Sequence, residues 1–96
     1  MHREADPALR QRKLDFKPEI DIRGVRGEEA IRLVQDLIDN ALMVQHRNLR
    51  ILHGKGNGIL RLLVRQYLAT VDVVKSFRDE HIEMGGSGIT VVEMDF

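Results

Sequence analysis

The stretch of sequence that determines the fold covers residues 49–60 and reads LRILHGKGNGIL. One face of a short predicted strand carries Leu49, Ile51 and His53. Glycines then occupy every second position, at Gly54, Gly56 and Gly58. A helix is predicted from about Ile59 to Thr70, because apolar residues recur at helical spacing from Ile59 to Leu68. A strand, a glycine loop and a helix in this order predict an α/β fold, with the loop at the carboxyl end of the strand.

Three further strands and one longer helix surround this stretch. Ile20 to Arg23 alternates apolar and polar residues, and Glu28 to Val44 carries a broad apolar stripe at helical spacing. Val73 to Phe77 and Ile89 to Met94 are predicted as the last two strands. The order β-α-β-α-β-β predicts a four-stranded mixed sheet, with right-handed parallel crossovers first and an antiparallel hairpin last. Two helices are expected to cover one face of the sheet and to leave the other partly open.

Residues 1–18 are predicted to be an N-terminal arm or linker, and residues 19–96 the folded domain. The arm carries many charges and few apolar groups. A short helix is expected from Ala5 to Lys13, and Pro18 prevents it from running further. The arm is expected to be mobile or to dock only through Leu14 and Phe16.

The composition of the 96 residues excludes several classes of protein. There is no cysteine, which excludes disulfides and thiolate metal sites, and aromatic residues are 4% of the chain. The 15 basic and 15 acidic residues balance, which argues against coating nucleic acid through overall charge. No apolar run approaches the roughly 20 residues of a membrane helix, and the N-terminus lacks the apolar core of a signal peptide. We therefore expect a cytoplasmic domain without a membrane partner.

The glycine loop has the chemistry of an anion site. Glycine permits positive φ and close backbone approach, and the helix that follows presents free N–H groups. Lys55 adds a full positive charge. The predicted phosphate-binding residues of the loop are Gly54, Gly56, Asn57 and Gly58. The spacing fits neither a P-loop nor a dinucleotide fingerprint, and a simple connecting turn stays an alternative.

The end of the first predicted strand should lie beside this loop, because the carboxyl ends of parallel strands share one edge of a sheet. That places Arg23, Gly24 and Asp21 near Lys55 and His53. A carboxylate can orient a histidine, and an arginine can clamp a phosphate. The alternatives are a surface ion pair between Asp21 and Arg23, and a histidine that is simply satisfied at a strand end.

Further basic residues could extend the phosphate-binding surface. Arg26 and Arg61 lie near the starts of the two predicted helices, where a positive charge opposes the helix dipole. Arg65 shares a helix face with Arg61. Arg50 and Lys75 are predicted to be plain solvated strand residues, and the remaining histidines show no metal-ligand spacing.

These motifs resemble those of the small MutS-related (Smr) domain family, especially the version at the end of bacterial MutS-type proteins of the second kind. Residues 20–24 read IDIRG and match its first box, and residues 53–58 read HGKGNG and match its second. Residues 74–93 resemble its closing hairpin. The match covers roughly residues 19–95. Arg23 stands where many standalone members of the family have histidine.

The resemblance implies a two-layer α/β sandwich and a nicking or endonuclease activity on DNA or RNA. It also implies a larger parent protein with an ATPase region, which suppresses recombination or acts on stalled ribosomes. By position, Asp21, Arg23, His53 and Lys55 are the predicted catalytic residues. DNA or RNA, the ATPase region and the ribosome are the implied partners.

Three mechanisms are compatible with the sequence. In the first, His53 transfers a proton, Lys55 and the loop amides hold the scissile phosphate, and Asp21 orients a partner or a metal. Only Glu93 offers a second acid, which favours one Mg²⁺ or Mn²⁺ ion or none; no metal ligand is assigned. In the second, the loop grips phosphates without chemistry. In the third, the open sheet face docks a protein.

Overall fold

The computed structural model describes residues 6–96, so the first five residues of the predicted arm, including Ala5, lie outside the described part. Helix α1 spans Pro7–Asp15. The side chain of Asp6 accepts hydrogen bonds from the N–H groups of Ala8 and Leu9 at 3.0 and 3.4 Å. Proline suits the first helical position after such a cap, so this helix begins at Pro7. It ends two residues later than the predicted Lys13.

The sheet has four strands in the order β1-β2-β4-β3. Their bounds are Glu19–Asp21 for β1, Asn48–Leu52 for β2, Val74–Asp79 for β3 and Ile89–Met94 for β4. Strands β1 and β2 are parallel, and β4 pairs antiparallel with both β2 and β3. The predicted mixed sheet, its first parallel pair and its closing hairpin are confirmed.

Strand β3 does not lie beside β2, although the crossover rule alone would pair them. Strand β4 takes the place between them, because its side chains are buried or half-buried along its whole length. Strand β3 exposes four of its six residues and suits the edge of the sheet. A bulge between Val74 and Ser76 shifts its register against β4.

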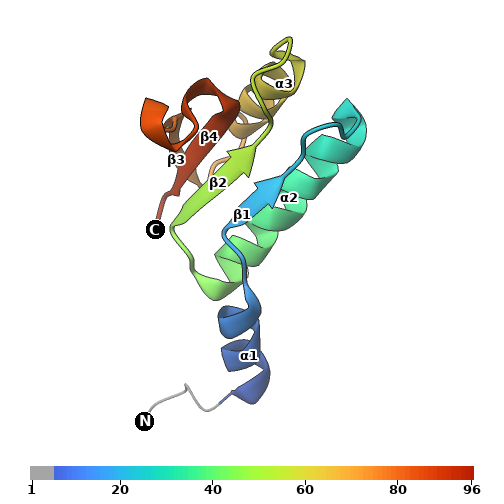
Figure 1. The fold of residues 1–96 in the computed structure, drawn as a ribbon. Helices are drawn as coiled ribbons and strands as arrows, with labels where there is room; N and C mark the ends of the chain where they lie inside the picture. The colour runs from blue at the N-terminus through green and yellow to red at the C-terminus, as the bar shows by residue number, and fades with distance from the viewer. Residues whose placement is uncertain (1–5) are drawn as a thin grey trace.

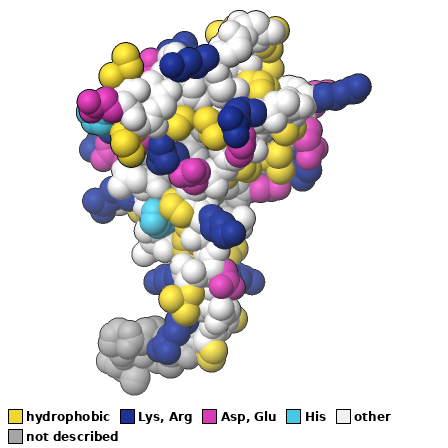
Figure 2. All heavy atoms as spheres, viewed as in Figure 1, with side chains coloured by type: hydrophobic (Ala, Val, Ile, Leu, Met, Phe, Trp, Pro, Cys, Tyr) yellow, Lys and Arg dark blue, Asp and Glu magenta, His cyan; other side chains and the backbone are white. Residues whose placement is uncertain are grey.

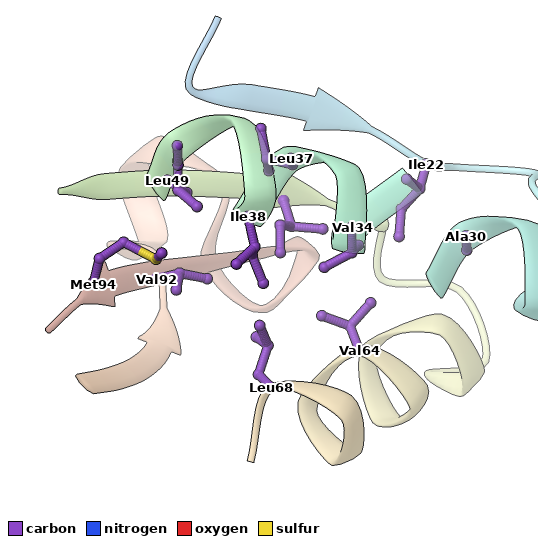
Figure 3. Close-up of a cluster of buried hydrophobic side chains, with 12 residues drawn as sticks. Ile22, Ala30, Val34, Leu37, Ile38, Leu49, Val64, Leu68, Val92 and Met94 are labelled. Carbon is purple, nitrogen blue, oxygen red and sulfur yellow. The ribbon is translucent and has the colours of Figure 1, made fainter. Parts of the chain in front are cut away.

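Helices α2 (Gly27–Val44) and α3 (Ile59–Leu68) pack on one face of the sheet and form the second layer (Figure 1). The two-layer arrangement with two helices on one face is therefore confirmed. The core lies between the layers, where side chains of α2, α3, β2 and β4 point toward one another (Figure 3). Its largest fully buried members are Ile22, Leu49, Ile51, Leu68 and Met94.

The connection between β3 and β4 covers part of the otherwise open sheet face. It contains two short 3-10 turns, η1 (Ile82–Met84) and η2 (Gly86–Gly88). Arg50 on β2 holds it through an ion pair with Glu80 at 3.0 Å and a hydrogen bond to the carbonyl of Met84 at 3.2 Å. Arg50 also pairs with Glu19 at 2.8 Å. The prediction that Arg50 is a plain solvated residue is wrong, because its guanidinium joins three segments of chain.

Helix α1 projects from the end of the domain at which β1 begins (Figures 1 and 2). The ring of Phe16 lies 5.4 Å from the ring of His46, measured between centroids, and also packs against the core. Leu14 is 72% exposed, so docking through Leu14 is wrong. Arg12 instead reaches Met43 on α2, with its Nη1 2.8 Å from the sulfur.

Among residues 6–96, no helix combines the length and the apolar character needed to cross a membrane.

Replacing Gly85 with alanine is expected to destabilise the domain by about 1–3 kcal/mol, from overpacking and backbone strain. Gly85 has a φ of +130°, and an added Cβ would collide with the Cδ1 of buried Ile89. Gly24→Ala is the matched control, since Gly24 has a φ of +77° but open space around the Cβ position. Urea unfolding of both variants measures the difference. Equal losses would contradict the role of the Ile89 contact.

Candidate phosphate-binding site

The glycine loop, residues 53–58, joins the carboxyl end of β2 to the start of α3. All three of its glycines have left-handed φ values, +82° at Gly54, +21° at Gly56 and +80° at Gly58. These values explain why glycine stands at each position, since a side chain there is strained. The loop encloses a hollow of about 50 Å³, which is more than one water molecule needs.

Helix α3 points its N-terminus at this hollow. Its N-cap residue is Gly58, which has no side chain to satisfy the first N–H groups. The side chain of Asn57 accepts only the N–H of Ile59, at 3.0 Å. Arg61 also lines the hollow, and its Nε is buried without a hydrogen-bond partner among residues 6–96. The positive end of a helix dipole with an arginine beside it is suited to an anion.

The base of the loop is fixed to the start of β4. The carbonyl of Gly88 accepts the N–H groups of His53 and Gly54 at 3.1 and 2.9 Å. The side chain of Lys55 packs against Gly88, where a Cβ would lie 3.4 Å from the lysine Cγ. These bonds fix the base of the loop, and Lys55 is exposed beside it.

The end of β1 lies beside the loop, as predicted from parallel pairing. The N–H of Ile22 donates to the carbonyl of Leu52 at 2.9 Å. The Arg23 side chain runs past Gly54, so close that an added Cβ would lie 3.3 Å from its Cγ. Gly24 follows in a left-handed turn with a φ of +77° and open space around it. The sequence therefore predicted the neighbourhood of Arg23 and the glycine loop correctly.

Asp21 faces Arg23. The guanidinium donates through Nε at 3.0 Å and through Nη2 at 2.8 Å to the two carboxylate oxygens. The Arg23 N–H adds a third bond at 3.1 Å. These bonds lower the pKa of the Asp21 carboxyl, the side-chain bond most. The alternative of an exposed Asp21–Arg23 ion pair is confirmed, and no hydrogen bond joins Asp21 to His53.

His53 is 6% exposed and uses both ring nitrogens. Nδ1 lies 3.0 Å from the carbonyl oxygen of Gly54, and Nε2 lies 2.8 Å from the hydroxyl of the fully buried Thr90. Arg65 donates to that hydroxyl oxygen through Nε and Nη2, at 3.3 and 3.2 Å. The Thr90 hydroxyl therefore donates its proton to Nε2, and the single ring proton of the neutral histidine is assigned to Nδ1, which donates to the Gly54 carbonyl.

Arg61 and Arg65 share an acidic partner that the sequence did not reveal. Asp79 at the end of β3 accepts from Arg61 at 2.9 Å and from Arg65 at 2.6 Å. These two guanidinium groups lower the pKa of Asp79, the hydrogen bond from Arg61 most. Arg65 also stands over the ring of Phe77, 5.7 Å from its centroid. Two cations share one carboxylate, so a net positive charge stays beside the hollow.

Two other predicted residues lie apart from the loop. Glu93 pairs across β2 with Asn48 at the beginning of that strand, and Lys75 lies 3.8 Å from its carboxylate. Glu93 is therefore at the wrong end of the sheet to be the second acid of the site. Arg26 caps α2 and lines a groove between α2 and α3 with Leu63.

The side chains present do not fit a divalent metal site. Among residues 6–96, no three His, Cys, Asp or Glu side chains are grouped to share an ion. Both carboxylate oxygens of Asp21 accept bonds from Arg23. Mg²⁺ and Mn²⁺ need oxygen ligands, so the donor set here favours an anion over a cation.

The stability of the domain is expected to fall as the pH drops below about 6.5, because burial lowers the pKa of His53 below its ordinary 6.5. The unfolded chain takes up a proton in this range, and the folded chain does not. The contribution of the neutral ring is complete above the unfolded pKa and is lost as the pH falls through the folded one. The ion-paired carboxylates of Asp21 and Asp79 also stabilise the fold. Their contribution is lost at lower pH, as the pH falls from the ordinary pKa of 3.8 toward the lowered values in the folded chain.

Urea midpoints measured across this pH range test the assignment. His53→Gln, which does not titrate, is expected to flatten the dependence of stability on pH below the ordinary histidine pKa of 6.5. An unchanged slope in this variant would assign the pH dependence to other groups.

Comparison with known proteins places this geometry in a family. The model of the Smr domain matches residues 20–95. The endonuclease MutS2 of Shouchella clausii is 42% identical over 91 residues, which cover 95% of this chain and 12% of that protein. The endonuclease MutS2 of Halalkalibacterium halodurans is 46% identical over 78 residues, which cover 81% and 10%. The chain thus spans about a tenth of the length of these relatives.

Two solved structures have the same fold. The Smr domain of Thermus thermophilus MutS2 is 38% identical with a TM-score of 0.79, over 81% of this chain and 98% of that one. YdaL, a stand-alone small MutS-related protein from Escherichia coli, is 25% identical with a TM-score of 0.78, over 100% of this chain and 82% of that one. Family model, relatives and fold agree: this chain belongs to the Smr domain family.

Proposed function

We propose that this domain binds the phosphate backbone of DNA or RNA in its glycine loop and nicks it there. The observation that carries the proposal is the hollow inside the glycine loop at the N-terminus of α3, which Arg61 also lines. Lys55 and Arg23 add two exposed cations at the same edge of the sheet. One backbone phosphate would meet loop amides, a helix dipole and full positive charges together.

The same groups suit the chemistry of phosphodiester cleavage. A water or sugar hydroxyl attacks phosphorus, the bond to the leaving oxygen breaks, and negative charge gathers on the other phosphate oxygens. That charge would be stabilised by Lys55, Arg23 and the loop amides. In preorganised sites such stabilisation lowers the barrier by roughly 3 kcal/mol for each donor. A proton must leave the nucleophile, and another must reach the leaving oxygen.

His53 is the proposed proton acceptor. Burial lowers its pKa, so the ring is neutral at pH 7, as a general base must be. Its Nε2 must first exchange the Thr90 hydroxyl for the nucleophile, and Arg65 can keep the hydroxyl in place through that change. Asp21 would orient Arg23 and not the histidine, because its carboxylate bonds to that guanidinium.

A second candidate function is a module that grips phosphates without cleaving them. The observation that favours it is the engagement of both nitrogens of His53 inside the protein. The phosphate contacts would be the same in both cases. Only the release of the ring from Thr90 separates the two.

The likeness to MutS2 proteins supports a place for the domain in a longer chain. The relatives are named endonucleases, and this chain matches about a tenth of each. We propose a parent protein with an ATPase region, for which this domain supplies the contact with DNA, RNA or the ribosome. The parent protein would then determine which nucleic acid the glycine loop contacts. Contact with recombining DNA would serve the control of recombination, and contact with the ribosome would serve the rescue of stalled ribosomes.

Incubation with supercoiled plasmid and with structured RNA tests the proposal, in lanes with Mg²⁺, Mn²⁺ or chelator. Wild-type protein is expected to nick one substrate, and His53→Ala, checked for folding by circular dichroism, to nick neither. Activity in chelator would support the metal-free route. Intact substrates with salt-sensitive retention on a gel would favour the binding module, because phosphate contacts weaken steeply with salt.

A further inference from the structure

The β3–β4 connection presents two large apolar side chains to solvent. Ile82 is 86% exposed and Met84 is 60% exposed, and we call this pair the apolar tip. Single exposed apolar residues are common on protein surfaces. Ile82 and Met84 lie together on one short turn, η1. In Figure 2 hydrophobic side chains are visible at the upper left, where Figure 1 places this connection.

The apolar tip is held in place. The N–H groups of Met84 and Gly86 both donate to the carbonyl of His81, at 2.8 and 2.9 Å. Arg50 binds the connection at two points, the carboxylate of Glu80 and the carbonyl of Met84. Side chains on a rigid turn lose little conformational entropy when a ligand binds, so this turn is suited to recognition.

The apolar tip is joined to the glycine loop through the same connection. Gly88, at the end of η2, accepts hydrogen bonds from His53 and Gly54 and contacts the side chain of Lys55. The tip and the loop therefore belong to one braced unit at one edge of the sheet. Ile82 Cγ1 would lie 3.8 Å from a Cβ added at Gly86, two residues before Gly88, so the path from the loop to the tip runs along this connection.

The charge beside the tip indicates which part of a nucleic-acid strand it meets. Exposed Glu83 lies between Ile82 and Met84, and a carboxylate repels backbone phosphates. Apolar side chains such as Ile and Met are those that proteins insert against unstacked bases. A tip with this composition suits bases and not phosphates.

We propose that Ile82 and Met84 form a wedge that packs against exposed bases of the strand whose phosphate lies in the glycine loop. The domain then prefers nucleic acid with unstacked bases over fully paired duplex. The inference rests on the proposed function, because the loop must hold a phosphate for the tip to meet a base. It assigns base contact to the β3–β4 connection and backbone contact to the loop.

Fluorescence anisotropy on two labelled DNA duplexes tests the wedge, one fully paired and one with a central two-base bulge. Wild-type protein is expected to bind the bulged duplex about tenfold more tightly, which corresponds to about 1.4 kcal/mol. The double variant Ile82→Ser with Met84→Ser should lose this preference and keep its affinity for paired duplex. Leu62→Ser is the matched control, since Leu62 on α3 is also exposed, at 56%, and should behave as wild type.

The outcomes separate the wedge from the proposed function. If Lys55→Ala weakens binding to both duplexes and the tip variant still prefers the bulge, the wedge is overturned and the loop stands. If wild-type protein binds both duplexes equally, the wedge is also overturned. If it binds neither duplex, both ideas fail. Loss of self-association in the tip variant, with unchanged DNA binding, would reassign the tip to a protein contact.

Discussion

Replacing Lys55 with alanine is expected to slow nicking by about 100-fold, the usual effect of removing one charge-stabilising group from a preorganised site. Lys55 is exposed beside the hollow, and its stem packs on Gly88. The ammonium group would therefore act at the phosphate with little further ordering. Plasmid or RNA cleavage under single-turnover conditions measures the rate. The binding constant of the variant should also depend less on salt. The slope of log K against log salt should fall by about one, the value for one lost phosphate contact.

Lys75→Ala is the control for this prediction. Lys75 is an exposed lysine at the opposite end of the sheet, beside Glu93. Its removal changes the net charge equally and should leave both the rate and the salt slope unchanged. Equal effects of the two variants would show that Lys55 acts only through overall charge.

Thr90→Val is expected to cost about 1–3 kcal/mol of folding stability, although the two side chains have nearly the same shape. Thr90 is fully buried, and its hydroxyl meets His53 and Arg65. Valine would leave Nε2 of the histidine without a partner in the protein interior, and it would free the ring from the position that fixes Gly54. Urea unfolding measures the loss, and nicking by the same variant measures the effect on the loop.

Thr70→Val is the matched control. The hydroxyl of exposed Thr70 donates to the carbonyl of Tyr67 at 2.7 Å, at the end of α3. Exposed hydrogen bonds contribute little, so a change below about 0.5 kcal/mol is expected. A loss for Thr90→Val no larger than this would mean that water or the backbone replaces the hydroxyl.

The parts of the fold that depend on local pattern could be predicted from the sequence. The glycine loop and the apolar stripes of α2 and α3 each carry their own signal, at glycine spacing or helical period. The place of β4 between β2 and β3 has no such local signal. The inner place in the sheet goes to whichever of β3 and β4 is better covered on both faces. How well each strand is covered can be read only from the packed structure.

The candidate site divides in the same way. The proximity of Arg23 to the loop follows from parallel pairing, so the sequence was sufficient to predict it. Asp79 and Thr90 come from β3 and β4, and the antiparallel pairing of these strands places the two residues opposite each other. The one available signal was the lone hydroxyl of Thr90 in an apolar strand, which needs a buried partner.

The projection of α1 has a practical consequence for handling the molecule. Strands β1 and β2 run in the same direction, so α1 enters at one end of the sheet and the glycine loop leaves from the other (Figure 1). A tether attached ahead of Pro7 would hold the domain by its remote end and present the loop outward. Immobilised in this way, single molecules should engage long DNA or RNA as freely as they do in solution.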